Sequence, residues 1–289
     1  MTNVKIAKTP LPSGYIPEPN TAPVNPTYWQ KFKQVIRSLL YLMLGTWPNI
    51  AFVVIKMSWF MANPSQEHLD KAMYIFQYPT STQNYHLVYK DGNNAKSLIA
   101  YTDSDWAADL AMCWSTTGYF ALLASSIICW QSHLQKTVAL LSTKAEYMAL
   151  SDTCQQVKWM KSLFEEISFP FRQVPIHGDN QGLIFIGSNP VQEWRIKHIN
   201  IHYHYICECI EDRSASLSFL PGCDNPMDMF TKNLPVISFM KFQEQLGIYF
   251  QNWQLMHLWA THKLLSAFMA AWLVRGCWNI FPLTPCEHL

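Results

Sequence analysis

Apolar residues follow a helical period in the first third of the chain. Between residues 28 and 78 they recur at helical spacing, with one apolar block at 39–44 and a second at 50–61. A third run follows Pro64 and Ser65, two residues typical of a helix start, and carries Leu69, Ala72, Met73 and Phe76. The pattern therefore predicts a small helical bundle over residues 27–90.

From residue 85 the pattern changes to short β-prone runs separated by turn signals. Strands are expected at 85–89, 98–103, 118–123, 127–131, 174–178 and 214–220. Helices are expected at 143–167, from Asp179–Asn180 onward, at 197–210, and from Asn225–Pro226 onward. Three strands precede the first of these helices, and the later strands alternate with helices. Residues 98–249 are therefore predicted to form an α/β domain, a mixed sheet with flanking helices.

The two ends of the chain carry weaker signals. Residues 1–26 are rich in proline, asparagine and threonine and are predicted to be an extended tether. Neither a signal peptide nor a membrane span is expected, because the start lacks an apolar core and the most apolar window, 264–274, is about half a span long. Residues 250–289 are left as an unassigned tail. The eight cysteines form no Cys-x-x-Cys pair and predict the reduced thiols of an intracellular protein, in the cytoplasm or nucleus.

The net charge of +1 conceals two halves of opposite sign. Residues 1–97 hold nine lysines and arginines against four acids, whereas residues 98–249 hold ten against fifteen. This division suits an enzyme that gathers cations at its site and binds a polyanion elsewhere. It suits two unrelated solvated surfaces equally well.

Two aspartates, Asp103 and Asp105, end the strand in "IAYTDSDW". Aspartate commonly ends a strand because its side chain bonds nearby backbone N–H groups, but a metal ligand would also stand there. Three further acids stand at predicted helix starts, where each has a structural interpretation as part of a cap. These are Glu146 three residues after Thr143, Asp179 before a helix, and Asp228 three residues after Asn225.

The positions of these acids along the predicted elements favour a metal site. Asp103 and Asp179 end strands, and Glu146 and Asp228 open helices that can pack beside the same sheet edge. Carboxylates that converge in this way repel one another unless cations neutralise them. Their oxygens suit Mg²⁺ or Mn²⁺, and two such ions about 3.5–4 Å apart would activate a water for phosphodiester hydrolysis.

Several ordered motifs carry a family resemblance. "YTDSDWAADLAMCWSTTGYF", "STKAEYMAL", "HGDNQGLIFIGSNP", "KHINIHYHYI" and "MDMFTKNLP" together resemble the ribonuclease H domain of copia-type retrotransposon polyproteins. The upstream stretch "RSLLYLMLGTWPNIAFVVIKMSWF" is similar to the end of the reverse transcriptase region of the same polyproteins. The resemblance implies a ribonuclease H-like fold, with Asp103, Glu146, Asp179 and Asp228 as the metal-binding acids. Asp105, the companion of Asp103 in its motif, stays as the alternative first ligand.

The resemblance also implies an activity and a partner. The activity is endonucleolytic hydrolysis of RNA in RNA–DNA hybrids with two Mg²⁺ or Mn²⁺ ions, and other parts of the polyprotein are candidate partners. Hybrid recognition would rest on minor-groove 2′-hydroxyls and on phosphates. The alternative is a catalytically weak remnant that at most binds nucleic acid. Polymerase activity is not expected, because the sequence contains no Tyr-x-Asp-Asp motif.

The sequence departs from the family pattern near the candidate acids. Leu141 stands where the family usually has serine, Lys144 where it has glutamate, and Asn200 where it has aspartate. Lys144 is two residues from Glu146, and we expect its ammonium to compete with a bound cation.

A cluster of histidines and cysteines offers a different metal chemistry. The cluster comprises His198, His202, His204, Cys207 and Cys209. It would make the protein a zinc-stabilised interaction module. We do not expect zinc here, because His204 falls off the helix face that His198 and His202 share, and the family motif accounts for His198 and His204.

Overall fold

The computed structural model describes residues 7–89, 97–106, 113–181 and 200–250. All of them belong to one unit of the chain, Met1–Gln251. The predicted helix from Asp179–Asn180 onward, the first residues of the predicted helix at 197–210, and the tail after residue 250 fall largely or wholly outside the described residues. No helix in the described residues is long and apolar enough to cross a membrane.

Three helices form the first part of the unit, as the apolar period predicted. They are α1 (Pro26–Gly45), α2 (Ala51–Ser58) and α3 (Gln66–Ser81), and two single turns, η1 (Pro48–Ile50) and η2 (Trp59–Met61), flank α2. Asn25 caps α1, and Ser65 caps α3 in a capping box with His68. The buried side of α3 carries Leu69, Ala72 and Ile75, whereas Met73, which the sequence placed on the same apolar stripe, is 50% exposed.

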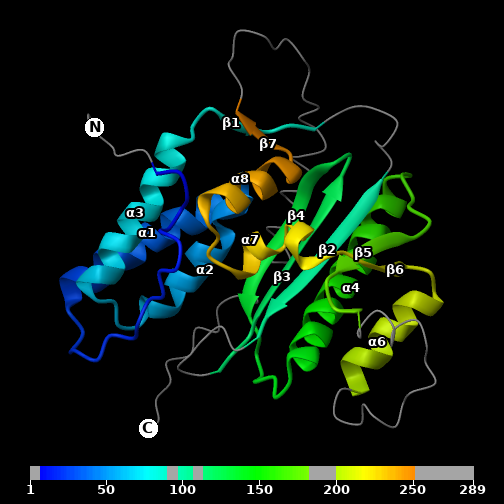
Figure 1. The fold of residues 1–289 in the computed structure, drawn as a ribbon, viewed down its shortest axis with the longest axis horizontal. Coiled ribbons are helices and arrows are strands. Elements are labelled where there is room, and N and C mark those ends of the chain that lie inside the picture. Colours follow the sequence, from blue (N-terminus) through cyan, green and yellow to red (C-terminus); the bar gives the residue numbers. More distant parts are fainter. Residues whose placement is uncertain (1–6, 90–96, 107–112, 182–199, 251–289) are drawn as a thin grey trace. The chain divides into compact units, whose positions relative to one another are not determined.

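A five-stranded mixed sheet lies at the centre of the second part (Figure 1). Its strands are β2 (Leu98–Asp105), β3 (Thr116–Leu123), β4 (Ser126–Leu134), β5 (Val174–Gly178) and β6 (Ala215–Phe219), in the order β4-β3-β2-β5-β6. The pairs β2–β3 and β3–β4 are antiparallel, and the pairs β2–β5 and β5–β6 are parallel. The structure thus confirms the predicted α/β fold, a mixed sheet with flanking helices preceded by a small helical segment.

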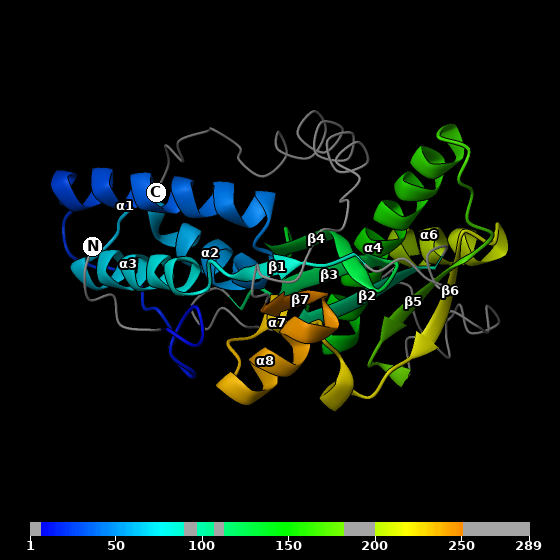
Figure 2. The same ribbon diagram turned by 90° about the horizontal axis from the view of Figure 1, so that it is seen from above.

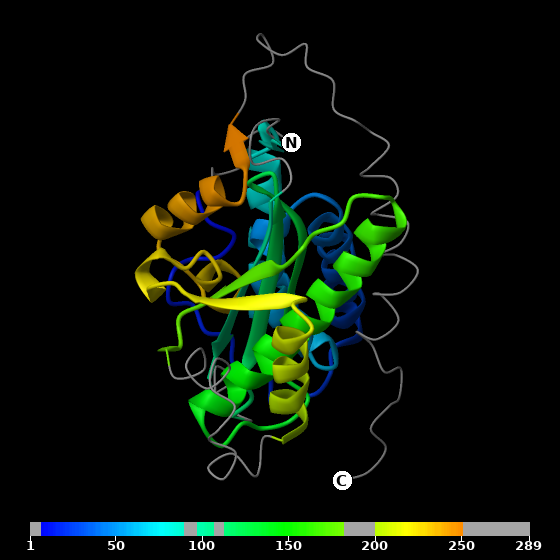
Figure 3. The same ribbon diagram turned by 90° about the vertical axis from the view of Figure 1, so that its right-hand side faces the viewer.

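Helices cover both faces of this sheet. Viewed from the side (Figure 3), the green α4 (Ser142–Glu166) and the yellow-green α6 (Asn200–Glu211) lie on one face. The short α7 (Asp228–Thr231) and the orange α8 (Val236–Gln245) lie on the other. The side of α4 that faces the sheet is buried from Ala145 to Phe164, whereas Trp159 and Leu163 are partly exposed.

A second, two-stranded sheet links residues far apart in the sequence. β1 (Tyr85–Leu87) pairs antiparallel with β7 (Ile248–Phe250), and the rings of Tyr85 and Phe250 meet edge to face. The sequence predicted a strand at 85–89 but none at 248–250. Three residues are too short a run for an alternating pattern to register.

The helices and the sheet share one hydrophobic core. Buried side chains of α1, α2 and α3 pack in the same cluster as Phe120, Ile127 and Phe230. Figure 2 shows the three helices grouped on the β4 side of the sheet, where Trp130 Nε1 donates to the Met43 carbonyl at 3.1 Å. The segment predicted as a reverse transcriptase remnant is therefore packed against the α/β part rather than separated from it.

A buried polar network crosses the same junction. The Tyr78 hydroxyl on α3 accepts from Asn49 Nδ2 at 2.8 Å and donates to Gln243 Oε1 on α8 at 3.1 Å. Because each partner lies on a different element, the network fixes how α3 and α8 are oriented.

The segment before α1 is also packed. Residues 7–25 contain no helix or strand, in keeping with an extended conformation, yet Ala7, Thr9 and Leu11 are buried. Asn233 Nδ2 donates to the Pro12 carbonyl at 2.6 Å. The described part of the predicted tether is thus held against the body of the protein.

Candidate active site

Three carboxylates converge where the parallel strands β2 and β5 end. Asp103 lies near the end of β2, and Asp179 follows Gly178, the last residue of β5. Glu146 comes from the second turn of α4, which packs across β2. One carboxylate oxygen from each of the three lies within 4.8 Å of the other two. Among the described residues this is the one group of three or more histidines, cysteines and acids that could hold a metal ion.

Two of these carboxyl groups, those of Asp103 and Glu146, resist ionisation in the protein alone. Burial raises the pKa of Asp103 from 3.8 to about 6, and only 2% of the residue is exposed. Burial, together with the charges of Asp103 and Asp179, raises the pKa of Glu146 from 4.5 to about 9. Desolvation and mutual repulsion therefore both oppose three negative charges here, and a cation among them would relieve both.

Neither Glu146 nor Asp228 acts as a helix cap in the structure. α4 begins at Ser142, one residue before the expected start, with Leu141 in the N-cap position and no side-chain cap bond. The predicted capping box between Thr143 and Glu146 is therefore not formed. The Asn225 side chain accepts from the Met227 N–H at 3.1 Å, and Asp228 is the first residue of α7 rather than its cap.

Asp228 lies beside the three acids but outside their group. Its Oδ1 accepts from Lys232 Nζ at 2.7 Å, and its charge contributes to the raised pKa of Asp103. On the same short helix, the Thr231 hydroxyl donates to Asp103 Oδ2 at 2.5 Å. Helix α7 thus contacts the centre of the acid group directly and carries Asp228 at its edge.

A glycine allows α7 to approach the sheet so closely. Gly118 on β3 is the register partner of Asp103. A Cβ atom at this position would lie 2.8 Å from Met227 Cε, 2.9 Å from Thr231 Cγ2 and 3.1 Å from Phe230 Cβ. Any larger residue would displace α7, and the hydrogen bond from Thr231 to Asp103 depends on that packing.

Comparison with known proteins gives the chain its relatives. It is 32% identical over 247 residues to the retrovirus-related Pol polyprotein from transposon TNT 1-94 of Nicotiana tabacum. The aligned residues are 86% of this chain and 18% of that polyprotein. It is 34% identical over 254 residues to the corresponding polyprotein from transposon RE1 of Arabidopsis thaliana, over 86% of this chain and 17% of the relative. The chain is homologous to the retrovirus-related Pol polyproteins of copia-like transposons. It spans less than a fifth of their length.

Further comparisons give a shorter relative and distant structures. The Pol-related chain is 37% identical over 129 residues to secreted RxLR effector protein 161 of Plasmopara viticola, over 45% of this chain and 90% of that protein. The structure of LC11-RNase H1 in complex with RNA/DNA hybrid matches 47% of this chain and 94% of its own, with 15% identity and a TM-score of 0.37. The structure of the foamy viral protease-reverse transcriptase in complex with RNA/DNA hybrid matches 73% of this chain and 28% of its own, with 13% identity and a TM-score of 0.39. No family model matches the chain.

The ammonium group beside the acids of this Pol-related chain is that of Lys232, not that of Lys144. No ion pair within the described part of the chain joins Lys144 to an acid, whereas Lys232 Nζ lies 3.9 Å from Asp103 Oδ2 and 2.7 Å from Asp228 Oδ1. Lys232 belongs to the motif "MDMFTKNLP", yet the sequence predicted no role for it. Its spacing of four residues from Asp228, one helical turn, was the available signal.

Asp105, the alternative first ligand, lies outside the group of three acids. It is partly buried, and burial raises its pKa, while the nearby ammonium groups of Lys232 and Lys56 lower it. The structure therefore brings Asp103, rather than Asp105, together with Glu146 and Asp179.

The histidine and cysteine cluster forms no comparable group within the described residues. His202, His204, Cys207 and Cys209 lie on α6, and His198 lies outside the described residues. None of the four on α6 belongs to a described set of three potential ligands.

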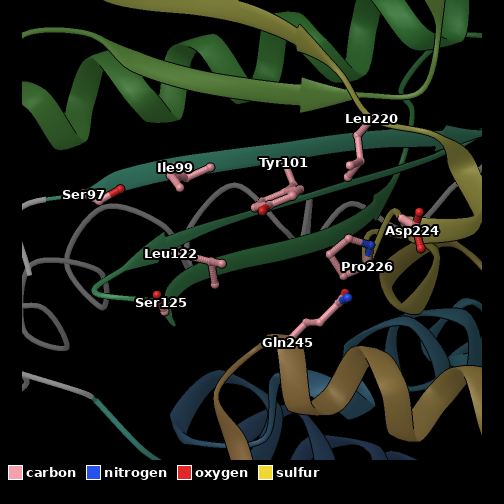
Figure 4. A pocket seen from close by; sticks show the side chains of 9 residues that line it. All are labelled: Ser97, Ile99, Tyr101, Leu122, Ser125, Leu220, Asp224, Pro226 and Gln245. Atoms are coloured by element: carbon pink, nitrogen blue, oxygen red, sulfur yellow. The ribbon is translucent and has the colours of Figure 1, made fainter. Parts of the chain in front are cut away.

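A pocket of about 420 Å³ lies on the face of the sheet that α7 and α8 cover (Figure 4). Ile99, Tyr101 and Leu122 form its apolar floor, and Asp224 and Gln245 contribute polar groups. Ile99, Tyr101 and Asp103 point to the same face of β2, because residues two apart on a strand share a face, so the pocket and the acid group lie at different points along that face. None of the four candidate acids lines this pocket.

Proposed function

We propose that this chain is a ribonuclease H that hydrolyses RNA within RNA–DNA hybrids. The observation that carries the proposal is the convergence of Asp103, Glu146 and Asp179 from three different elements to within 4.8 Å. Two of these carboxyls are buried at an energetic cost that no helix cap or turn requires.

The donor set fits hard divalent cations. Carboxylate oxygens are the ligands that Mg²⁺ and Mn²⁺ prefer, and three of them would hold an ion here without a soft ligand. Two such ions would activate a water and stabilise the leaving oxygen of the phosphodiester. Asp103, Glu146 and Asp179 would hold them, and Asp228 would complete the set from α7. Thr231 orients Asp103 through its hydrogen bond, so the Asp103 side chain needs little rearrangement.

The substrate class follows from the relatives and from charge. Pol polyproteins of retrotransposons are the homologues, and other parts of such a polyprotein are the partners that we propose. The balance of nine basic to four acidic residues in residues 1–97 suits binding of phosphates. We place this activity inside the cell, in the cytoplasm or nucleus.

The test is cleavage of a labelled RNA strand, free or paired with DNA, by the full chain with Mg²⁺ or with EDTA. We expect Mg²⁺-dependent cuts in the hybrid only. Asp103→Asn, Glu146→Gln and Asp179→Asn should each lower the rate at least ~100-fold, because they keep the shape and remove the charge that holds the ion. Asp228→Asn should be milder, about 10–100-fold, since Asp228 lies at the edge.

Stability separates a ligand from a structural acid. Without metal, the three central variants should melt at the wild-type temperature or above it, because each replaces a carboxyl that lies close to two others by a neutral group. Asp152→Asn is the control: Asp152 lies on α4 like Glu146 but pairs with His133 at 3.2 Å, and its loss should leave cleavage unchanged. Variants that melt lower yet still cleave would refute the proposal. Hybrid binding without any cleavage would instead favour a catalytically weak remnant.

A further inference from the structure

A lysine lies among the carboxylates of the proposed site. Lys232 directly follows α7, and its Nζ lies 2.7 Å from Asp228 Oδ1 and 3.9 Å from Asp103 Oδ2. Its side chain is 41% exposed, whereas that of Asp103 is 2% exposed. The ammonium group therefore reaches from solvent into the edge of a buried acid group.

The position of Lys232 is set by the packing of α7 rather than by a free surface side chain. The Lys232 backbone N–H donates to the Asp228 carbonyl at 2.8 Å, and the preceding residue, Thr231, is fully buried and bonded to Asp103. Gly118 leaves room for this arrangement. Although burial alone would lower the pKa of Lys232, the charges of Asp103 and Asp228 raise it, so the side chain stays charged.

The contacts divide the four acids into two sets. Asp103, Glu146 and Asp179 form a group with no ammonium closer than 3.9 Å among the described residues. Asp228 instead makes a charge-assisted hydrogen bond to Lys232. A cation that needs an oxygen of Asp228 would have to displace the lysine and would meet its positive charge at close range.

We propose that Lys232 is a built-in counter-cation that occupies the Asp228 side of the site and makes the protein bind its two divalent ions with unequal affinity. The first ion binds through Asp103, Glu146 and Asp179, and the second binds only when Lys232 has left Asp228. Lys232 is thus a positioning residue that regulates how much metal the site holds. This inference rests on the proposed function, since it takes the same acids as ligands.

The test measures metal binding directly, without nucleic acid. The full chain is freed of metal and titrated with Mn²⁺, and the free ion is followed by electron paramagnetic resonance. The wild type should bind one ion tightly and a second more weakly. Lys232→Gln should tighten the second dissociation constant by ~10-fold or more, with a smaller change in the first, because the repelling charge is lost. Lys232→Arg keeps the charge and should retain the weak second ion.

A matched ion pair elsewhere provides the control. Lys241 Nζ lies 2.8 Å from Asp224 Oδ1, so Lys241→Gln removes a similar pair and the same charge, and it should leave both constants unchanged. Constants that stay unchanged, or weaken, in a folded Lys232→Gln would overturn the inference alone, provided that Asp103→Asn still abolishes Mn²⁺ binding. Wild-type protein that binds no Mn²⁺, or binding indifferent to Asp103→Asn, would overturn the proposed function and this inference with it.

Discussion

At the scale of single residues, Asp103 and Glu146 are buried carboxyl groups whose ionised forms are destabilised. Glu146 and Asp103 take up protons more readily than free carboxyl groups do, because burial and neighbouring charges penalise their ionised forms. Such groups make the stability of a protein depend on pH. The direction follows from the sign of the shift.

Metal-free protein should lose stability as the pH rises. The folded protein binds the Glu146 proton more tightly than the unfolded chain, where the pKa is near its usual 4.5. The stabilising contribution is therefore complete below pH 4.5 and is lost progressively up to about pH 9; Asp103 adds a smaller loss up to about pH 6. Melting temperatures in EDTA from pH 5 to 9 measure this loss.

Glu146→Gln supplies the comparison for that experiment. It cannot ionise, so its melting temperature should decline less steeply than that of the wild type over the same range. Saturating Mg²⁺ should restore much of the lost stability of the wild type, since the ion binds only the folded state. Parallel pH profiles of the two proteins would show that folding does not raise the pKa of Glu146.

The sequence predicted the identities of these residues better than their surroundings. The motifs pointed to Asp103, Glu146 and Asp179, which the structure brings together, but their burial depends on packing across the sheet. Nearness to Glu146 in sequence favours Lys144 as the competing cation, but the ammonium that lies 3.9 Å from Asp103 Oδ2 is that of Lys232. Trp106, one residue beyond the second aspartate of the motif, is 49% exposed despite its large ring, and its Nε1 donates to the Ala139 carbonyl.

At the scale of elements, the docking of α7 on β3 connects fold and site. The helix has only four residues and would not be stable alone. Its position depends on Met227, Phe230 and Thr231 packing against the strand at Gly118. The candidate acid Asp228 and Lys232 are placed by this packing.

Gly118→Ala should loosen the packing of α7 on β3. The added Cβ would lie 2.9 Å from Thr231 Cγ2 and 3.1 Å from Phe230 Cβ. Rotating Thr231 would break its hydrogen bond to Asp103, and Phe230 Cβ cannot move without the helix, so we expect a loss of about 1–3 kcal/mol. The Mn²⁺ affinity of the site should fall as well. Urea unfolding and the Mn²⁺ titration measure the two effects.

Gly45→Ala is the matched control for that substitution. Gly45 ends α1, and nothing lies within 4 Å of an added Cβ. Its replacement should leave stability unchanged or raise it by up to about 1 kcal/mol, because alanine favours the helix. If both alanine variants behave alike, close packing at Gly118 does not set the position of α7.

Long elements were predictable from pattern, and short ones were not. The strands of the main sheet and helix α4 were predicted within a few residues, because each repeats its apolar period over several turns or alternations. The turn between β3 and β4 is Ala124–Ser125, with φ values of 52° and 62°, although neither residue is typical of that left-handed geometry. The pairing of β3 with β4 imposes this left-handed geometry, and the sequence of the turn does not predict it.

At the scale of the whole molecule, the basic helices and the acidic sheet region form one body. A deletion of residues 1–97 would expose Phe120, Ile127 and Phe230, which pack against the three helices. The shortened protein would therefore lose stability as well as positive charge, and its binding of nucleic acid would not report on charge alone. Charge must therefore be changed without removing the helices. Helix α1 offers Lys31, Lys33 and Arg37, of which the first and last are exposed.

Replacing those three residues by glutamine should weaken hybrid binding and flatten its salt dependence. Each phosphate that the protein no longer neutralises lowers the slope of log K against log salt by roughly 0.9 for a DNA-like duplex. The matched variant replaces Lys158, Lys161 and Arg172 by glutamine, which removes the same charge from the acidic region. Binding at several salt concentrations gives the slopes; an equal change in both triple variants would mean that α1 makes no specific contribution.

The pairing of β1 with β7 has a consequence for the integrity of the protein. Tyr85–Leu87 and Ile248–Phe250 are joined by backbone hydrogen bonds, and between them lies the chain of the entire main sheet. The helices on one side of this junction are also held by the shared core. A protease that cut the backbone once between β1 and β2 would therefore release nothing: two fragments would remain associated, and the nick would become visible only in denaturant.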